Sequence, residues 1–403
     1  MKSHYDFVIV GSGAAGRTAV ETLVTEAPES SVLLVDSESR LPYKRTRVSK
    51  QVASGKPVPD VHPASWYEDA GIHLALGEPV REILPNEQSL TLGPHKIGYG
   101  ALLLAVGASP KQPFDSSELI LPLWTPQDAG RLNRLLDRSQ RILVAGSGVL
   151  GVEAAWQAVL AGKDVVLAGD TSLPMSRFLD KALSEHLNGI MTDAGVRLEL
   201  CESVAELHEQ PSGGVRARLK GCDGEHSLDV DAAVVAVGSL PNTDLARRAG
   251  LNTRRGICVD SSLKSSNPHI WAAGDCAEHP GDVVTGLWHA AEHQGKLAAM
   301  SMLGHSPSDI LPPFRLKCEV FNHYYFSGGP LAAPVSEELP QAQTWNLNGI
   351  LWRARFNSSG RLKALGAASP GGMDKNLARA AQKQLTEEAG LQAVKEVLSG
   401  PVS

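Results

Sequence analysis

One short pattern occurs twice in this chain of 403 residues, and it constrains the possible folds more than any other feature. Each copy has a run of apolar residues, a loop with three spaced glycines and a helix-like stretch. The apolar runs, residues 7–10 and 141–145, are typical of parallel strands buried on both faces. The loops are Gly11-Ser12-Gly13-Ala14-Ala15-Gly16 and, 135 residues later, Gly146-Ser147-Gly148-Val149-Leu150-Gly151. A strand–loop–helix unit repeated in this way indicates an internal duplication.

The spacing of the glycines in the first loop suits a dinucleotide. Gly11 allows a tight turn, Gly13 lets the backbone approach a pyrophosphate, and Gly16 permits close packing of helix against strand. The start of the helix offers N–H groups and a partial positive charge to phosphates. Asp36 ends the next strand-like run, twenty residues past Gly16, where a carboxylate can bond ribose hydroxyls. We therefore expect a dinucleotide on the first unit.

The second unit repeats the strand, the glycines and the helix but differs at the acidic position. The match to Asp36 falls near Gly169, and Asp170 follows one residue later. Either Asp170 replaces the missing carboxylate after a small shift in its position, or the ribose of the second dinucleotide has no acidic partner. A 2′-phosphate would need a nearby cation, for which Arg177 is the only close candidate. A second dinucleotide is expected, and the choice between NADH and NADPH stays open.

These patterns predict an α/β fold with two Rossmann-like dinucleotide-binding domains and a C-terminal α+β domain. Strand-like runs at 101–108 and 232–238 end in similar turns and close the two duplicates. A hairpin over 349–367 and a helix over about 374–389 are expected near the end of the chain. The predicted boundaries are 1–118 and 244–312 for the first domain, which is discontinuous, 119–243 for the second, and 313–403 for the third.

Bulk properties exclude several classes of protein. A net charge of −6 and a pI near 6.1 argue against a nucleic-acid partner, and no run of eighteen apolar residues is present to span a membrane. The N-terminus lacks the pattern of a signal peptide, so a cytoplasmic location is expected. The five cysteines form no C-x-x-C pair and no zinc-ligand spacing, so no metal site is expected.

Three further motifs accompany the glycine loops. They are L-P-Y-K-R-T-R-V-S-K at 41–50, W-A-A-G-D-C-A at 271–277 and W-H-A-A-E-H-Q-G at 288–295. Together they resemble the FAD-dependent pyridine nucleotide-disulfide oxidoreductase superfamily, in its branch of rubredoxin and ferredoxin reductases, over residues 5–312. The resemblance implies FAD on the first unit and NADH or NADPH on the second.

The resemblance also implies roles for individual residues. Arg45 would contact FAD, while Lys50 would lie near flavin N5 and pair with Glu153, which makes these two the candidate catalytic residues. An ammonium near N5 favours the negative charge that arrives with a hydride, and a carboxylate would hold it in place. Thr46 stands where the family usually has proline, so the local turn is expected to differ.

The remaining cofactor contacts follow from the other motifs. Asp275 would accept a hydrogen bond from the ribityl chain of FAD. Ala105 and Gly107 belong to the turn that matches an A-T-G motif, with Val106 in place of the threonine. Trp288 would begin a helix whose positive end lies beside the pyrimidine side of the flavin.

The implied activity is transfer of hydride from NAD(P)H to flavin N5, followed by passage of electrons to a rubredoxin or ferredoxin. Because no local cysteine pair stands beside the flavin motifs, disulfide reduction is disfavoured and electrons would leave from the flavin itself. Two alternatives stay open. One is an NAD(P)H oxidase or the flavoprotein subunit of a larger complex, and the other is a flavin-binding interaction or sensor protein with a vestigial nicotinamide site.

Two features bear on the partners of the protein. A basic cluster would suit an acidic electron-transfer protein or would neutralise the FAD phosphates; it comprises Lys44, Arg45, Arg47, Lys50 and Lys56. In the family the C-terminal region often forms a dimer or partner interface, so a homodimer is possible. The aromatic run 321–326 would either form the core of that region or line the flavin.

Overall fold

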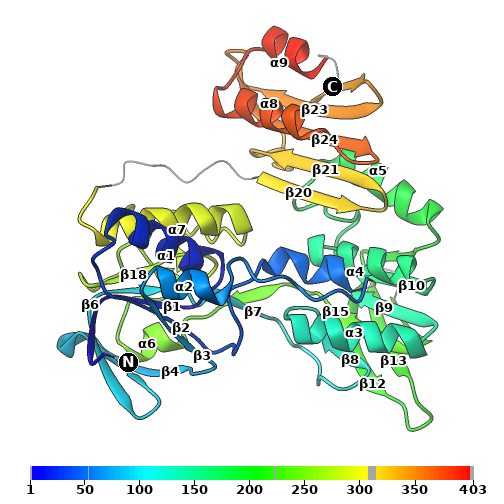
Figure 1. The fold of residues 1–403 in the computed structure, drawn as a ribbon. Coiled ribbons are helices and arrows are strands. Elements are labelled where there is room, and N and C mark those ends of the chain that lie inside the picture. The colour runs from blue at the N-terminus through cyan, green and yellow to red at the C-terminus, as the bar shows by residue number, and fades with distance from the viewer. Residues whose placement is uncertain (1, 53, 222–223, 307–314, 400–403) are drawn as a thin grey trace. The chain divides into compact units, whose positions relative to one another are not determined.

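The fold is described from a computed structural model that covers residues 2–52, 54–221, 224–306 and 315–399 (Figure 1). Its internal contacts divide the chain into two compact units. Unit 1 comprises Met1–Arg47, Val58–Ser109 and Ser239–Pro312, and unit 2 comprises Val48–Pro57, Pro110–Gly238 and Pro313–Ser403. Each glycine loop lies in a different unit, and the C-terminal region belongs to the same unit as the second loop.

Unit 1 is built on a seven-stranded sheet with the order β3-β2-β1-β6-β5-β4, in which β18 also pairs with β6. Strands β1, β2, β3, β6 and β18 are parallel, while β4 and β5 extend the sheet in antiparallel fashion. The bounds are β1 His4–Val10, β2 Val32–Asp36, β3 Ile72–Leu76, β4 Val80–Leu84, β5 Ser89–Leu92, β6 His95–Leu104 and β18 Ile270–Ala272. Val8 and Ile9 are fully buried, as the apolar run in β1 predicted.

Helices α1 (Ala14–Glu26) and α7 (Trp288–Met302) pack against each other in unit 1 (Figure 1). Their close approach requires Gly295, because a Cβ there would lie 2.1 Å from the carbonyl oxygen of Ala15. The shorter elements are α2 Ala64–Asp69, α6 Asp244–Arg248, β16 Ser239–Pro241, β17 Ile257–Cys258 and β19 Ala277–Glu278, with β7 Ala108–Pro110 where the chain leaves the unit. The middle of α7 therefore packs closely against the start of α1.

Unit 2 contains a five-stranded parallel sheet with the order β11-β10-β9-β15-β8. Its elements are β8 Ile120–Pro122, α3 Pro126–Arg138, β9 Arg141–Ala145, α4 Val149–Leu160, β10 Asp164–Gly169, α5 Lys181–Asp193, β11 Arg197–Leu200 and β15 Ala232–Val235. Helix α3 begins in a capping box, in which Thr125 and Asp128 satisfy each other's backbone N–H groups. An antiparallel sheet that the sequence patterns did not predict follows, with strands β12 Ser203–Glu209, β13 Val215–Gly221 and β14 Gly224–Val230.

The C-terminal part of unit 2 is an antiparallel sheet with the order β20-β21-β24-β23-β22 and two helices. The bounds are β20 Arg315–Val320, β21 His323–Gly328, β22 Gln343–Leu347, β23 Ile350–Phe356, β24 Leu362–Pro370, α8 Lys375–Thr386 and α9 Leu391–Leu398. The predicted hairpin is β23 and β24. The predicted closing helix ends earlier than expected, because Glu388 has a left-handed φ of 46° and a second helix begins after Gly390.

The aromatic run contributes to the core of this sheet. Tyr325 and Phe326 are buried, and Phe326 belongs to the same apolar cluster as Trp352 and Leu362.

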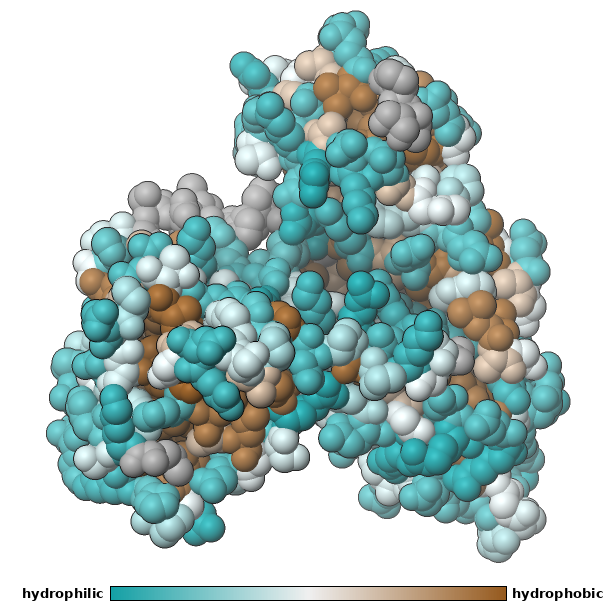
Figure 2. Space-filling view, in the orientation of Figure 1, coloured by the Kyte–Doolittle hydropathy of each residue, from teal (hydrophilic) through white to brown (hydrophobic). Residues whose placement is uncertain are grey.

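Hydrophilic residues cover most of the face of the molecule shown in Figure 2, and apolar residues form separate patches on it. No helix among the described residues is long and apolar enough to cross a bilayer. The predicted α/β class, with two Rossmann-like units and a further C-terminal sheet, is confirmed.

Candidate active site

The first glycine loop joins β1 to α1 and leaves space where a phosphate would lie. Gly11 has a φ of +104°, and a Cβ there would lie 2.2 Å from the carbonyl oxygen of Ala105, so only glycine fits. A Cβ on Gly13, in contrast, would meet no atom within 4 Å. Helix α1 has no side-chain cap at Gly13, so its first N–H groups point toward that open space.

Asp36 ends β2 at the edge of this loop. Its carboxylate accepts hydrogen bonds from the backbone N–H of Ser12 at 2.6 Å and of Glu38 at 2.8 Å. A carboxylate has about four acceptor positions, so two remain for ribose hydroxyls. The structure thus holds Asp36 rigidly where the sequence placed a ribose acceptor.

A second acidic group of unit 1, Asp275, follows Gly274 and is only half-buried. Among the described residues no hydrogen bond or ion pair reaches its carboxylate. Burial raises the pKa of Asp275, and the positive charge of Arg45 acts in the opposite direction. Arg45 itself forms an ion pair with Glu38 at 2.7 Å. A half-buried carboxylate that no described residue contacts by a hydrogen bond can accept hydrogen bonds from a ligand. This is the role that the resemblance gave to Asp275.

The turn at Ala105 and Gly107 follows β6 and is fixed by backbone contacts. The N–H of Ala105 donates to Val10 at 2.8 Å, and the carbonyl of Gly107 accepts from Asn242 at 2.9 Å. Val106 occupies the position of the family's threonine, and its carbonyl accepts from the Asn242 side chain at 2.8 Å. The turn therefore keeps a defined shape without the threonine hydroxyl.

Trp288 is the first residue of α7, and its ring lies 5.9 Å from the Arg17 guanidinium. Arg17 is buried and also pairs with Glu21 at 2.7 Å and with Glu292 at 2.5 Å. Gln294, one helical turn and a half further along, accepts the N–H of Gly274 at 2.6 Å. These contacts fix the start of α7 relative to both the first glycine loop and Asp275.

The second glycine loop in unit 2 repeats the geometry of the first. Gly146 has a φ of +117°, and a Cβ there would lie 2.3 Å from the carbonyl oxygen of Ala236. A Cβ on Gly148 would meet no atom within 4 Å, and α4 begins there without a side-chain cap. Val149 and Leu150 form the first turn of α4, and Gly151 packs against the carbonyl of Gly146. This loop can also hold a pyrophosphate.

Strand register identifies the position that matches Asp36. Val10 pairs with Val35 in unit 1, and Ala145 pairs with Ala168 in unit 2, so Asp36 corresponds to Gly169. A Cβ at Gly169 would lie 2.3 Å from the Ser147 hydroxyl oxygen, which excludes a larger residue while Ser147 stays in place. Asp170 is exposed and forms an ion pair with Arg177 at 2.9 Å. The second unit therefore has a carboxylate one residue later in the chain than the first, and this carboxylate is already paired with a cation.

Glu153 on α4 and Lys50 belong to unit 2 but do not form the direct ion pair that was expected. The Ser49 hydroxyl donates to one oxygen of Glu153 at 2.5 Å, and the Cys318 thiol donates to the other at 3.8 Å. Lys50 acts on Glu153 through charge, with no ion pair within 4.0 Å in the described part of the chain. Neither Ser49 nor Cys318 was singled out from the sequence, because they lie 104 and 165 residues from Glu153.

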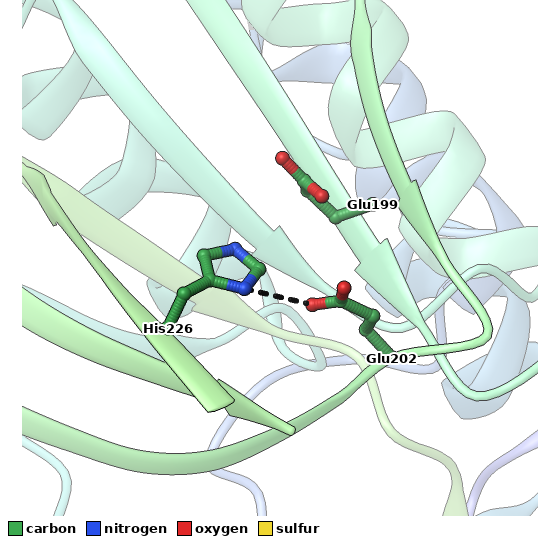
Figure 3. A group of neighbouring side chains, drawn as sticks. All are labelled: Glu199, Glu202 and His226. Carbon is green, nitrogen blue, oxygen red and sulfur yellow. Dashed lines mark ion pairs between the residues drawn. The ribbon is translucent and has the colours of Figure 1, made fainter. Parts of the chain in front are cut away.

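A separate group of polar side chains in unit 2 consists of Glu199, Glu202 and His226, whose ligand atoms lie within 4.8 Å of one another (Figure 3). His226 pairs with Glu202 at 3.6 Å, and Glu199 accepts from Arg197 at 2.6 Å. Each of the three side chains thus already has a charged neighbour, and we assign no metal to the cluster.

The amino-acid pattern that produces this geometry is shared with a known family. The family model described as pyridine nucleotide-disulphide oxidoreductase matches residues 5–295. This chain belongs to that family. It is therefore an oxidoreductase that uses FAD and a nicotinamide nucleotide, in agreement with the prediction from the glycine loops.

Curated relatives match over most of their length. The "Nitric oxide reductase FlRd-NAD(+) reductase" of Aeromonas salmonicida is 30% identical over 354 residues, which are 87% of this chain and 89% of the relative. The protein of the same name from Shigella sonnei is 32% identical over 314 residues, or 77% and 82% of the two chains. These matches place the chain among the reductases of the family.

Solved structures agree on the fold. The ferredoxin reductase for the CYP199A2 system of Rhodopseudomonas palustris has a TM-score of 0.85 at 24% identity and covers 98% of this chain and 100% of that one. The covalent putidaredoxin reductase–putidaredoxin complex has a TM-score of 0.84 at 22% identity, with 98% of both chains covered. At these identities the likeness establishes the architecture.

The residues present in this oxidoreductase fit the two cofactors of its family. Three features of unit 1 suit FAD: the open space over Gly13 suits its pyrophosphate, the rigid Asp36 suits a ribose, and Asp275, which has no hydrogen-bond partner among the described residues, suits its polyhydroxy chain. In unit 2 the open space over Gly148 suits the pyrophosphate of a nicotinamide nucleotide. Each unit thus offers a cradle that a side chain at the middle glycine would fill.

Proposed function

We propose that this chain is a reductase that takes hydride from NADH or NADPH and passes electrons to a small electron-transfer protein such as a rubredoxin or ferredoxin. The observation that carries the proposal is the pair of equivalent phosphate cradles over Gly13 and Gly148 in one chain. The cradle over Gly148 suits the nucleotide that donates electrons, and the cradle over Gly13 suits FAD. The names of the relatives, which describe reductases that act between FlRd and NAD(+), support a protein as acceptor.

The state of the cysteines supports direct transfer from the flavin. The described cysteines Cys201, Cys258, Cys276 and Cys318 are all free thiols. Burial raises the pKa of Cys276 to about 11, and burial together with the nearby Glu153 raises the pKa of Cys318 well above its ordinary value. Reactive cysteines have a lowered pKa, so Cys276 and Cys318 do not suit disulfide chemistry. Cys222 lies outside the described residues.

The following roles are part of the proposal. When bound, FAD supplies a group that accepts a hydride and donates single electrons. Lys50 presents a positive charge near the reacting end of the cofactor, and Glu153 keeps a compensating carboxyl group beside it. Asp275 and Arg45 hold the flavin end of FAD in unit 1. Asp170 accepts from the ribose of the nicotinamide nucleotide in unit 2.

Asp170 also bears on the choice of nucleotide. A 2′-phosphate would meet the Asp170 carboxylate, and the nearest cation, Arg177, is already paired with that carboxylate at 2.9 Å. Repulsion by Asp170 and the neutralisation of Arg177 both disfavour NADPH. We therefore propose that NADH is the preferred donor.

The proposal extends to organisation and location. We propose an FAD domain of residues 1–118 and 244–312, a nicotinamide domain of 119–243 and a C-terminal domain of 313–403 that serves as a partner or homodimer interface. We also propose a cytoplasmic location, where NADH and small electron-transfer proteins are available.

The decisive experiment follows NADH oxidation by the purified flavoprotein alone, then with rubredoxin, and then with ferredoxin. The proposal expects slow oxidation alone and an increase of at least tenfold with one of the two proteins. Rapid oxidation without any added protein would instead support an NADH oxidase. A flavin that neither nucleotide bleaches would support an interaction or sensor protein.

A further inference from the structure

We propose that Cys318 is a positioning residue in this reductase. Cys318 and Ser49 together hold the Glu153 carboxyl group in one orientation. The inference rests on the proposed function, because it concerns the residue that acts beside Lys50. It assigns a role to a thiol that lies in the C-terminal sheet, outside every motif of the two dinucleotide units.

Three distant segments of unit 2 meet at Glu153. The 3-10 turn at Ser49–Gln51 carries Ser49, helix α4 carries Glu153, and strand β20 carries Cys318. Ser49 and Cys318 are 2% and 1% exposed, so both donors are removed from competing water. Each donor takes a different oxygen, Ser49 at 2.5 Å and Cys318 at 3.8 Å. Two donors on two oxygens define both the position and the rotation of the carboxyl plane.

The electrostatics of the cluster agree with this arrangement. Burial raises the pKa of Glu153, and the hydrogen bond from Ser49, the charge of Lys50 and the hydrogen bond from Cys318 oppose that rise, in this order. The pKa of the Cys318 thiol is itself raised, first by burial and then by the charge of Glu153. A thiol with a raised pKa keeps its proton, so Cys318 remains a donor over the working pH range.

The hydrogen bond from Cys318 to Glu153 matters because Lys50 does not fix the orientation of the Glu153 carboxyl group. Because Lys50 makes no direct ion pair with Glu153, it does not orient the carboxyl group. Ser49 alone would leave the carboxyl free to rotate about its bond to that hydroxyl. Cys318 removes this freedom, and it does so from the domain that we propose as a partner interface.

The first test reads the thiol directly. Infrared spectra of the purified flavoprotein, without nucleotide or acceptor, are recorded for the wild type, Glu153→Gln and Cys318→Ser. We expect one S–H stretching band that is absent in Cys318→Ser and shifts in Glu153→Gln, with Cys201→Ala as an exposed-thiol control that leaves this band unchanged. A Cys318 band that is identical in the wild type and in Glu153→Gln overturns the inference.

The second test reads the consequence for the reaction. The rate of flavin reduction by NADH in a single turnover is measured against pH for the wild type, Cys318→Ala and Cys318→Ser. Loss of the donor in Cys318→Ala should raise the acid-side midpoint by about 0.5 pH unit, since a weak hydrogen bond is involved. Cys318→Ser keeps a donor and should return the midpoint to the wild-type value or below it. Equal shifts in both variants would indicate a packing role and overturn the inference.

The two tests separate this inference from the proposed function. A shifted S–H band in a protein that fails to reduce any electron-transfer protein would leave the role of Cys318 standing and remove only the acceptor assignment. An unshifted band in a protein that reduces rubredoxin or ferredoxin would remove the role of Cys318 and leave the acceptor assignment standing.

Discussion

The first two glycines of the nicotinamide loop allow a paired prediction, because the structure gives Gly146 and Gly148 opposite surroundings. A Cβ at Gly146 would lie 2.3 Å from the carbonyl oxygen of Ala236, on a backbone with a φ of +117°. A Cβ at Gly148 would meet nothing within 4 Å, on a backbone with a φ of −77°. Gly146→Ala should therefore damage the fold, whereas Gly148→Ala should damage only nucleotide binding.

The magnitudes follow from these surroundings. Alanine at Gly146 combines a strained backbone with overpacking against a carbonyl group, and together these should cost about 3 kcal/mol or more of unfolding free energy. Alanine at Gly148 adopts its backbone angles without strain, so the stability should change by less than about 1 kcal/mol. Its methyl group would keep the pyrophosphate from the loop. The loss of one charge-assisted hydrogen bond, about 1.5–3 kcal/mol, should raise the Kd of NADH roughly tenfold to a hundredfold.

The assay combines urea unfolding with anaerobic titration of flavin reduction against NADH concentration. FAD content serves as the control, because both substitutions lie in unit 2 and the FAD cradle lies in unit 1. A Gly148→Ala variant that binds NADH as tightly as the wild type would refute the placement of the pyrophosphate. A Gly146→Ala variant with unchanged stability would refute the steric argument.

Three further predictions concern the acidic positions. Asp170→Ala should raise the Kd of NADH about fivefold, the value of one hydrogen bond, and should lower the Kd of NADPH because the repelling carboxylate is removed and Arg177 is released; parallel titrations with both nucleotides check this. Gly169→Asp should destabilise the protein by about 1–3 kcal/mol in urea through its contact with Ser147, and Ser147→Gly in the same chain should restore most of the loss. Because the folded-state pKa of Asp275 is raised, its protonation stabilises the apoprotein at low pH and this stabilisation is lost as the pH rises. Asp275→Asn apoprotein should therefore be more stable than the wild type at pH 7, with the difference vanishing below about pH 4, the ordinary pKa of aspartate; equal stabilities at pH 7 would contradict the assignment.

The strands and loops of the dinucleotide units could be predicted because their causes are local. A short apolar run predicts a strand buried on both faces, and glycine is required where φ is positive or where a carbonyl lies against the backbone, as at Gly11 and Gly146. The same logic located Asp36 and its counterpart Gly169, since both end the strand that follows the helix.

The parts that could not be predicted depend on contacts between distant segments. The sheet of β12, β13 and β14 has many charged residues and buries few side chains on β14, so it lacks a clear apolar alternation. The hydrogen bonds of Ser49 and Cys318 to Glu153 join three segments that no spacing in the sequence connects. The family motif therefore pointed to Lys50 as the partner of Glu153, whereas the fold supplies two uncharged donors.

The most direct test of the whole account is the spectrum of the purified flavoprotein mixed with NADH in the absence of oxygen. The account predicts a yellow protein whose flavin absorbance bleaches rapidly, and more readily with NADH than with NADPH. A folded protein that retains no FAD, or whose flavin stays oxidised with both nucleotides, would contradict it.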